Sequence, residues 1–509
     1  MKNKFRYIPL ILGLLAASLC IQPAWTQSTA LPSLGDGEGI SLAAERKLGD
    51  RIARELYRDP DYLEDPVLDE YIQRLWAPLV KSAAARGELS PELQERFAWR
   101  ILLGRDRSVN AFALPGGYLG VHLGLIAVVT THDELASVLA HELSHVTQRH
   151  IARSMGEQGK MTPWVIGSLI LGILAASKSA QGAQAMIVGG QAAAIQSQLS
   201  YSRDMEREAD RVGYGVMSEA GYDPQGFVGM FGKLQQAAGL NDNGAYPYLR
   251  SHPLTTERIA DMQARLQLSA APARPVIDVE QAMLSARARV LSLGNVDAWR
   301  ASTQTSQVNL PQATAATRAG IWYGATLAHM QLKDYAAAER SLQNLERVVS
   351  GQAAPSRLAT LLRVEWAMAQ NRWQAVLPLL GSPGQLGKLP RPELIAAAQA
   401  LIHLPASAAR TEVLRQLREQ VLNYPLDAQA WNTLANLLAA EGQTLPSLRA
   451  EGEAQMARMD WQGAIDRFRA AQDWAKSHQL QAGDHIEASI VDTRLRHAQS
   501  LMREVQAER

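Results

Sequence analysis

Residues Thr131–Met155, THDELASVLAHELSHVTQRHIARSM, decide the fold that we predict for this chain. Thr131 and Glu134 form a capping-box pattern, in which a side-chain oxygen satisfies a free N–H group at the start of a helix. Apolar side chains then recur at the spacing of one helix face: Leu135, Val138, Leu139, Leu143 and Val146. The pattern predicts a single helix over the whole stretch.

An H-E-x-x-H motif lies inside this predicted helix and consists of His141, Glu142 and His145. Histidines four residues apart lie above one another on a helix, so both rings can reach one zinc ion. Glu142 is placed to take a proton from a water molecule that the zinc acidifies, and the hydroxide then attacks a carbonyl. The motif therefore predicts one Zn²⁺ per subunit and metal-assisted hydrolysis.

A third zinc ligand is expected, because a catalytic zinc usually has three protein ligands and one open position. Glu206, in the sequence EREAD, is the candidate for this ligand. Asp210 lies one turn later on the same face, where it can accept a hydrogen bond from a ligand histidine and fix its tautomer. Glu208 points to a different face and is expected to be solvated. Three other histidines are predicted to lie off the face of the zinc site: His122, His132 and His150.

His252 lies in the sequence RSHPL, and its role is open. It is interpreted as an ordinary loop histidine, as a hydrogen-bond donor to the oxyanion formed at the attacked carbonyl, or as a fourth zinc ligand. Pro253 biases His252 toward an extended backbone, which aims the ring as a unit. We favour the fourth, regulatory ligand, because a closed four-ligand site has no open position for catalysis and would keep the enzyme latent.

A short apolar strand is predicted at Val109–Leu114, where the sequence PGG ends it shortly before the zinc helix. Further strands are predicted at Phe97–Leu103 and Tyr118–Val121. We expect the first strand to lie at the edge of a small sheet, with free N–H and C=O groups facing the cleft. A substrate would add to this edge as an extended strand. The candidate substrate-binding residues are therefore Asn110, Ala111, Phe112 and Ala113.

The beginning of the chain has the pattern of an export signal. Three basic residues precede the apolar run Tyr7–Leu19, whose length suits a signal peptide better than a membrane span. We predict a signal peptide at 1–26 and a periplasmic location, with an N-terminal membrane anchor as the alternative. Cys20 is the only cysteine, so the exported chain would contain no disulfide. A net charge of +1 gives no indication of nucleic-acid binding.

Residues 163–200 are unusually rich in apolar side chains, glycine and alanine. One interpretation is a helical pair packed beside the active site. The other is a membrane-surface or substrate-gating element, which gives the protein a possible peripheral contact with a membrane.

After a linker at 271–275, residues 276–509 are predicted to be almost entirely helical, with a repeat texture. Small residues let paired helices approach closely, while aromatic residues fill the gaps between pairs. The most regular match to the tetratricopeptide pattern consists of Trp322, Ala325, Ala328, Asp334, Tyr335, Ala338 and Leu342. A plain helical bundle is the alternative.

Four motifs together resemble the gluzincin family of the CAAX prenyl protease and the heat-shock membrane protease. They are NAFALPGG at 110–117, HELSH at 141–145, EREADRVG at 206–213 and SHP at 251–253. The resemblance implies zinc bound by His141, His145 and Glu206, with Glu142 as the general base. The order of signal peptide, protease and repeats is similar to that of periplasmic members, and this implies work on the assembly of outer-membrane proteins.

The predicted protein is therefore mainly α-helical, with a gluzincin-type zinc metallopeptidase domain at 40–270 that contains a small edge β-sheet. A tetratricopeptide-like domain at 276–509 is expected to hold an outer-membrane barrel assembly complex. The expected activity is zinc-dependent hydrolysis of peptide bonds in unfolded or misassembled outer-membrane β-barrel proteins. The alternative is a chaperone or adaptor that acts through its repeats; Glu142 argues against it, because a protein without proteolysis has no need of a carboxylate beside zinc.

Overall fold

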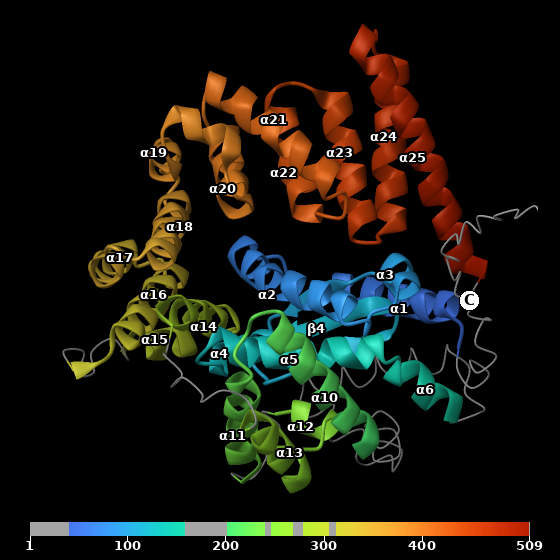
Figure 1. Cartoon of the computed structure of the whole chain (residues 1–509). Helices are drawn as coiled ribbons and strands as arrows, with labels where there is room; N and C mark the ends of the chain where they lie inside the picture. The colour runs from blue at the N-terminus through green and yellow to red at the C-terminus, as the bar shows by residue number, and fades with distance from the viewer. Residues whose placement is uncertain (1–39, 158–200, 240–245, 268–277, 305–311, 508–509) are drawn as a thin grey trace, which may run out of the picture.

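The computed structural model describes residues 40–157, 201–239, 246–267, 278–304 and 312–507 (Figure 1). Within them the chain is mainly helical with one small sheet, which confirms the predicted fold class. The predictions for the signal peptide, the segment 163–200 and the linker 271–275 lie outside the described residues. No helix in the described part of the chain is long and apolar enough to cross a membrane.

Several helices of the N-terminal half, residues 40–267, begin directly after a residue whose side chain caps them. Asp65 accepts a hydrogen bond from the backbone N–H of Leu68, and Pro66 follows at a position where its missing N–H is not needed. The elements of this half are α1 (Leu42–Arg58), β1 (Tyr62–Leu63), α2 (Pro66–Ala85), α3 (Pro91–Arg96), β2 (Arg100–Gly104), β3 (Ala111–Leu114), β4 (Tyr118–His122), α4 (Leu123–Val128), α5 (His132–Thr147), α6 (His150–Glu157), α10 (Arg203–Glu219), α11 (Gln225–Gly239), α12 (Tyr248–Ser251) and α13 (Thr256–Gln267).

The four strands form one sheet in the order β1-β2-β4-β3, so β3 lies at an edge as predicted. β2 runs parallel to β4, whereas β3 runs antiparallel to it, with Leu114 opposite Tyr118. Gly116 and Gly117 make the turn between β3 and β4 at φ values of 72° and 85°, which residues with a side chain rarely adopt. α5 packs against β3 and therefore runs beside the edge strand.

The predicted helix over 131–155 is wrong in one respect, because it is broken into α5 and α6. Thr131 caps α5 as expected, with its side-chain oxygen accepting from the N–H of Glu134. The break comes at Arg149, whose φ of 53° is left-handed and cannot continue an α-helix. Arg149 is held there by hydrogen bonds from its Nε to Glu45 Oε2 (3.1 Å) and from its Nη2 to the carbonyl of Ile40 (2.6 Å).

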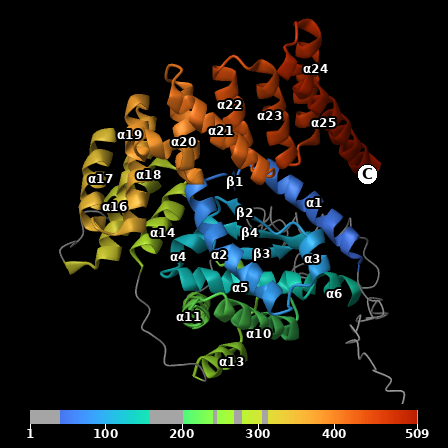
Figure 2. The same ribbon diagram turned by 45° about the horizontal axis from the view of Figure 1, so that its top comes forward.

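The C-terminal half, residues 278–507, is entirely helical within its described residues. Its helices follow one another in an arc that passes over α2 and α1 (Figures 1 and 2). The tetratricopeptide interpretation of this arc stays a prediction. The helices are α14 (Val279–Leu291), α15 (Val296–Gln304), α16 (Ala315–Gln331), α17 (Tyr335–Val349), α18 (Ala353–Ala369), α19 (Val376–Leu380), α20 (Arg391–Ile402), α21 (Ala408–Asn423), α22 (Ala428–Ala440), α23 (Thr444–Ala457), α24 (Trp461–Ser477) and α25 (Ala482–Ala507).

Ion pairs and a shared apolar core join the two halves. Arg287 on α14 reaches Asp65 at the start of α2 with an Nη2–Oδ2 distance of 2.6 Å, and Arg458 binds Glu64 at the same distance. α14 also packs against α4, and one hydrophobic cluster continues from α2 and α5 into α14, α16 and α18. The predicted domain boundary falls in residues 268–277, which are not described, and it stays a prediction.

Candidate metal centre

Four buried side chains from three parts of the N-terminal half meet at one point. α5 contributes His141 and His145, α10 contributes Glu206, and His252 follows directly after α12. None of the four is more than 2% exposed, and one ligand atom from each lies within 4.8 Å of the others. These four side chains of the described residues form a group that could hold a metal ion.

The separations between the ligand atoms fit a single zinc ion. His141 Nε2 lies 3.0 Å from His145 Nε2 and 3.4 Å from His252 Nδ1. Glu206 Oε1 lies 2.9 Å from His252 Nδ1 and 3.5 Å from His145 Nε2. Four ligands about 2.0–2.2 Å from one ion in tetrahedral directions stand about 3.3–3.6 Å apart, close to these separations.

Glu142 lies next to this cluster and is completely buried. Its Oε2 accepts a hydrogen bond from the backbone N–H of Ala113 on β3 at 2.9 Å. Among the described residues, its Oε1 has no hydrogen-bond partner, and it lies 3.5 Å from His252 Nε2. Burial raises the pKa of the Glu142 carboxyl. A buried carboxylate with one free oxygen at the edge of a metal site is suited to accepting a proton there.

A second layer of charged groups holds the cluster from behind. Asp210 Oδ1 lies 2.9 Å from His141 Nδ1, and Arg258 reaches Asp210 through Nε (2.6 Å) and Nη2 (2.8 Å). Arg258 Nη1 also lies 2.7 Å from Glu206 Oε2. Burial opposes ionisation of Asp210, but the hydrogen bonds from Arg258 and His141 outweigh it and lower the pKa of this carboxyl. The predicted position of Asp210 behind His141 is observed, whereas nothing in the sequence singled out Arg258.

The sequence of the chain is similar to known proteases over most of its length. Residues 67–266 match the model of peptidase family M48. The chain is 30% identical to the β-barrel assembly-enhancing protease of Escherichia coli over 482 residues, which cover 91% of each protein. It is 29% identical to that of Yersinia pestis over 452 residues, or 87% of this chain and 88% of the relative. The mitochondrial metalloendopeptidase OMA1 of Arabidopsis thaliana is 31% identical over 198 residues, or 38% of this chain and 36% of the relative. The chain belongs to peptidase family M48.

Membership of family M48 makes this chain a zinc-dependent metalloendopeptidase, as the sequence predicts. The four candidate ligands also include a carboxylate that stays ionised and can attract a cation. Burial opposes ionisation of Glu206, but the charge of His252 and hydrogen bonds from His141 and His252 hold the pKa of this carboxyl well below its usual range. Burial lowers the pKa of His141, yet hydrogen bonds to Asp210 and Glu206 raise it to about 10.

Two tyrosines stack on histidine rings of the candidate metal centre. Tyr201 stacks on His145, with ring centroids 3.8 Å apart and an interplanar angle of 23°. Tyr248 stacks on His252, with centroids 4.5 Å apart at 25°. Neither contact is predictable from the sequence, because no helix period connects residues 201 and 248 to the motif. The stacked partners restrict ring rotation and so help to aim the imidazole nitrogens.

His150 is not one of the four candidate ligands, in line with its predicted place off the zinc face, but it contacts one of them, which was not predicted. His150 Nδ1 lies 2.8 Å from His145 Nδ1, and its Nε2 lies 3.0 Å from Glu208 Oε2. Glu208 does lie on another face of α10, but it is not simply solvated, because it also binds Arg153. The prediction holds for His122, which lies beside Ser108, and for His132, which lies at the start of α5 near Asp278.

The candidate substrate-binding residues lie along the edge strand beside the M48 site. Ala111, Phe112 and Ala113 belong to β3, and Asn110 immediately precedes it. Phe112 is half-buried, whereas the other three are buried. The N–H of Ala113 is bound to Glu142, which places the strand within hydrogen-bond reach of the candidate base.

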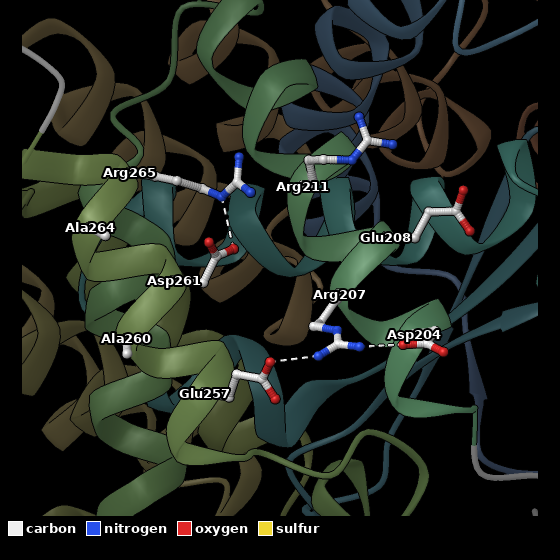
Figure 3. A pocket seen from close by; sticks show the side chains of 9 residues that line it. All are labelled: Asp204, Arg207, Glu208, Arg211, Glu257, Ala260, Asp261, Ala264 and Arg265. Atoms are coloured by element: carbon white, nitrogen blue, oxygen red, sulfur yellow. Dashed lines mark hydrogen bonds and ion pairs between the residues drawn. The ribbon is translucent and has the colours of Figure 1, made fainter.

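The outer side of α10 forms a charged groove with α13 (Figure 3). Arg207 binds Glu257 across this groove and Asp204 within α10, and Arg265 binds Asp261 within α13. Glu208 lines the groove but points away from these pairs. The three acidic partners are engaged by arginines, so the groove lacks the free carboxylates that a second metal site requires.

Proposed function

We propose that this metalloendopeptidase acts in the periplasm, where it degrades misfolded or stalled outer-membrane proteins and assists their assembly. The peptidase part of the proposal is carried by one observation: the free Oε1 of Glu142 lies beside four convergent ligand side chains. The substrate part is supported by similarity to proteins named β-barrel assembly-enhancing proteases.

In the proposed mechanism, His141, His145 and Glu206 would hold a zinc ion, and the bound ion would supply the Lewis acidity that polarises a peptide carbonyl and makes a water molecule more acidic. Glu142 Oε1 accepts the proton from this water as the general base and later delivers it to the departing amine. Ala113 holds the other carboxylate oxygen and keeps Oε1 directed into the site. Asp210 accepts a hydrogen bond from the Nδ1–H of His141, which leaves Nε2 of this ring as the nitrogen that can bind zinc.

His252 is proposed to be a regulatory fourth ligand. Its Nδ1 lies among the ligand atoms, 2.9 Å from Glu206 Oε1, and its Nε2 lies 3.5 Å from Glu142 Oε1. A ring in this position occupies the place that water and substrate need, which supports a latent resting state. For catalysis His252 would have to leave this position, and donation of a hydrogen bond to the oxyanion is the other predicted role.

Substrate is proposed to bind as an extended strand along β3, at residues 110–113. The position of β3 at the edge of the sheet supports this, because no other strand among the described residues pairs with its outer side, where the N–H of Ala113 is bound to Glu142. Backbone hydrogen bonds tolerate many sequences, as a protease for misfolded proteins requires. Folded barrels have no open strand edge, so they should escape cleavage.

The helical arc of the C-terminal half is proposed to bind the outer-membrane barrel assembly complex, as a tetratricopeptide array would. No nucleic acid is expected among the partners, because the net charge is +1. Export by a signal peptide at 1–26 and a peripheral membrane contact through 163–200 remain parts of the proposal.

Cleavage of one purified outer-membrane barrel protein, offered in its unfolded and folded forms, tests the proposed function. The wild-type chain should cut the unfolded form, spare the folded form and stop when a chelator removes zinc. Equal cleavage of both forms would contradict binding at the β3 edge. Assembly support that persists unchanged in the Glu142→Gln variant would favour the chaperone or adaptor interpretation.

A further inference from the structure

A line of hydrogen-bonding groups runs outward from the metal cluster on the side of His145. His145 Nδ1 faces His150 Nδ1 at 2.8 Å, and His150 Nε2 faces Glu208 Oε2 at 3.0 Å. Arg153 Nη1 donates to the same Glu208 oxygen at 2.7 Å. Both histidines are buried, whereas Glu208 is partly exposed on the rim of the groove between α10 and α13 (Figure 3).

The proton positions along this line follow from the chemistry of imidazole. If His145 Nε2 binds zinc, its lone pair points to the ion and the ring proton must be on Nδ1. His150 Nδ1 must then accept the hydrogen bond that His145 Nδ1–H donates, which requires a neutral His150 ring with its proton on Nε2. His150 Nε2–H in turn donates to Glu208, an acceptor whose second donor is Arg153. Each contact therefore has one donor and one acceptor.

The backbone is bent to bring His150 to this place. In an uninterrupted helix, a residue five positions after His145 would lie about 140° around the axis, away from the zinc face. The left-handed φ of 53° at Arg149 breaks the helix and returns the next ring to His145. Backbone in this region is unfavourable for a side-chain-bearing residue and persists where the surroundings enforce it. Here Glu45 and the carbonyl of Ile40 do so through the Arg149 guanidinium.

We infer that His150, supported by Glu208 and Arg153, is a positioning residue that fixes the tautomer and orientation of His145 for zinc. His145 would thus have its own partner, as His141 has Asp210. The inference rests on the metal site proposed above. Outer partners of metal-bound histidines typically contribute about 10–100-fold in metal affinity.

Zinc affinity, measured by competition with a chromophoric chelator on the purified full chain, tests the inference. His150→Phe keeps a buried aromatic ring but removes the acceptor, and zinc should bind about 10–100-fold more weakly. His150→Asn places an amide oxygen near the position of Nδ1, so it should recover much of the affinity. The visible spectrum of the Co²⁺-substituted chain should shift in the Phe variant and return toward wild type in the Asn variant.

Variants of Glu208 keep the inference testable if His150→Phe does not fold. Glu208→Ala leaves the Nε2–H of His150 without its acceptor and should weaken zinc binding, whereas Glu208→Gln retains a carbonyl acceptor and should weaken it less. Asp204→Ala is the matched control, because Asp204 also lies on α10 and pairs with an arginine in the same groove. This control should bind zinc as the wild type does.

The outcomes separate this inference from the proposed site. If the wild type binds no zinc, or His145→Ala binds it as tightly as the wild type, the proposed metal site fails. If the wild type binds zinc and a folded His150→Phe binds it equally well, only the positioning role is overturned. Equal affinities of Glu208→Ala and the Asp204→Ala control would overturn the contribution of Glu208.

Discussion

Replacing Arg287 by methionine should strongly destabilise the chain, because this arginine joins the two halves from a buried position. Arg287 is 4% exposed and binds Asp65 through Nε (2.9 Å) and Nη2 (2.6 Å). Its Nη1 donates to the hydroxyl of Tyr323 at 3.1 Å and lies 2.9 Å from Glu365. Removal of one partner from a buried ion pair leaves an uncompensated charge and typically costs about 3–5 kcal/mol.

Arg74→Met provides the matched control, since Arg74 pairs with Glu280 between the same two helices, α2 and α14. The Arg74 side chain is 47% exposed, and water already solvates the pair. We therefore expect a loss below about 1 kcal/mol from this change. Equilibrium urea unfolding of the full chain, followed by circular dichroism, measures the unfolding free energy of both variants.

A second change shows whether the uncompensated charge of Asp65 causes the loss. Asp65 also caps α2 by accepting from the N–H of Leu68 at 2.9 Å, and an asparagine oxygen can do the same. The double variant Arg287→Met/Asp65→Asn should therefore be more stable than Arg287→Met alone. A loss below about 1 kcal/mol for Arg287→Met would refute the argument, because such a value belongs to an exposed pair.

Three further predictions concern the site and the start of α5. Asp210→Asn should weaken zinc binding about 10–100-fold, measured by chelator competition, because the amide is a poorer acceptor for the Nδ1–H of His141. His252→Ala should increase self-cleavage of the purified chain if the ring is a latent ligand; reduced cleavage of an unfolded substrate would instead indicate an oxyanion donor. The carboxylate of Asp278, 3.8 Å from Nδ1 of His132, raises the pKa of this ring. The stabilisation from this pair is therefore fully present below the unfolded pKa of about 6.5 and is lost as pH rises through the folded value. The melting temperature of the wild type should therefore exceed that of His132→Asn by more at about pH 6 than at about pH 8.5, and an equal difference at both would contradict this.

The sequence predicted those parts of the fold that depend on local patterns. α5 begins at the predicted cap, Thr131, because a capping side chain and a helical apolar period act together within one segment. The H-E-x-x-H spacing and the position of Glu206 likewise predicted that His141, His145 and Glu206 would meet. These predictions needed only helix geometry and the known number of zinc ligands.

The features that sequence reasoning missed depend on contacts between distant segments. Arginine is a good helix former, so nothing local predicts the break at Arg149, which Glu45 and Ile40 enforce from the other end of the N-terminal half. His150 contacts the candidate ligand His145 only because of that break. Arg258 comes from a helix about 48 positions beyond Asp210 and has no periodic relation to it.

The Glu142→Gln variant tests the central claim, that this chain hydrolyses peptide bonds with Glu142 as the base beside a zinc ion. The change keeps the size of the side chain and leaves all four candidate ligands in place. Turnover of an unfolded substrate by the purified full chain should be measured together with its zinc content. The account predicts that zinc stays bound while kcat falls by about 10²–10⁴-fold. Wild-type turnover by a zinc-loaded Glu142→Gln variant would contradict it.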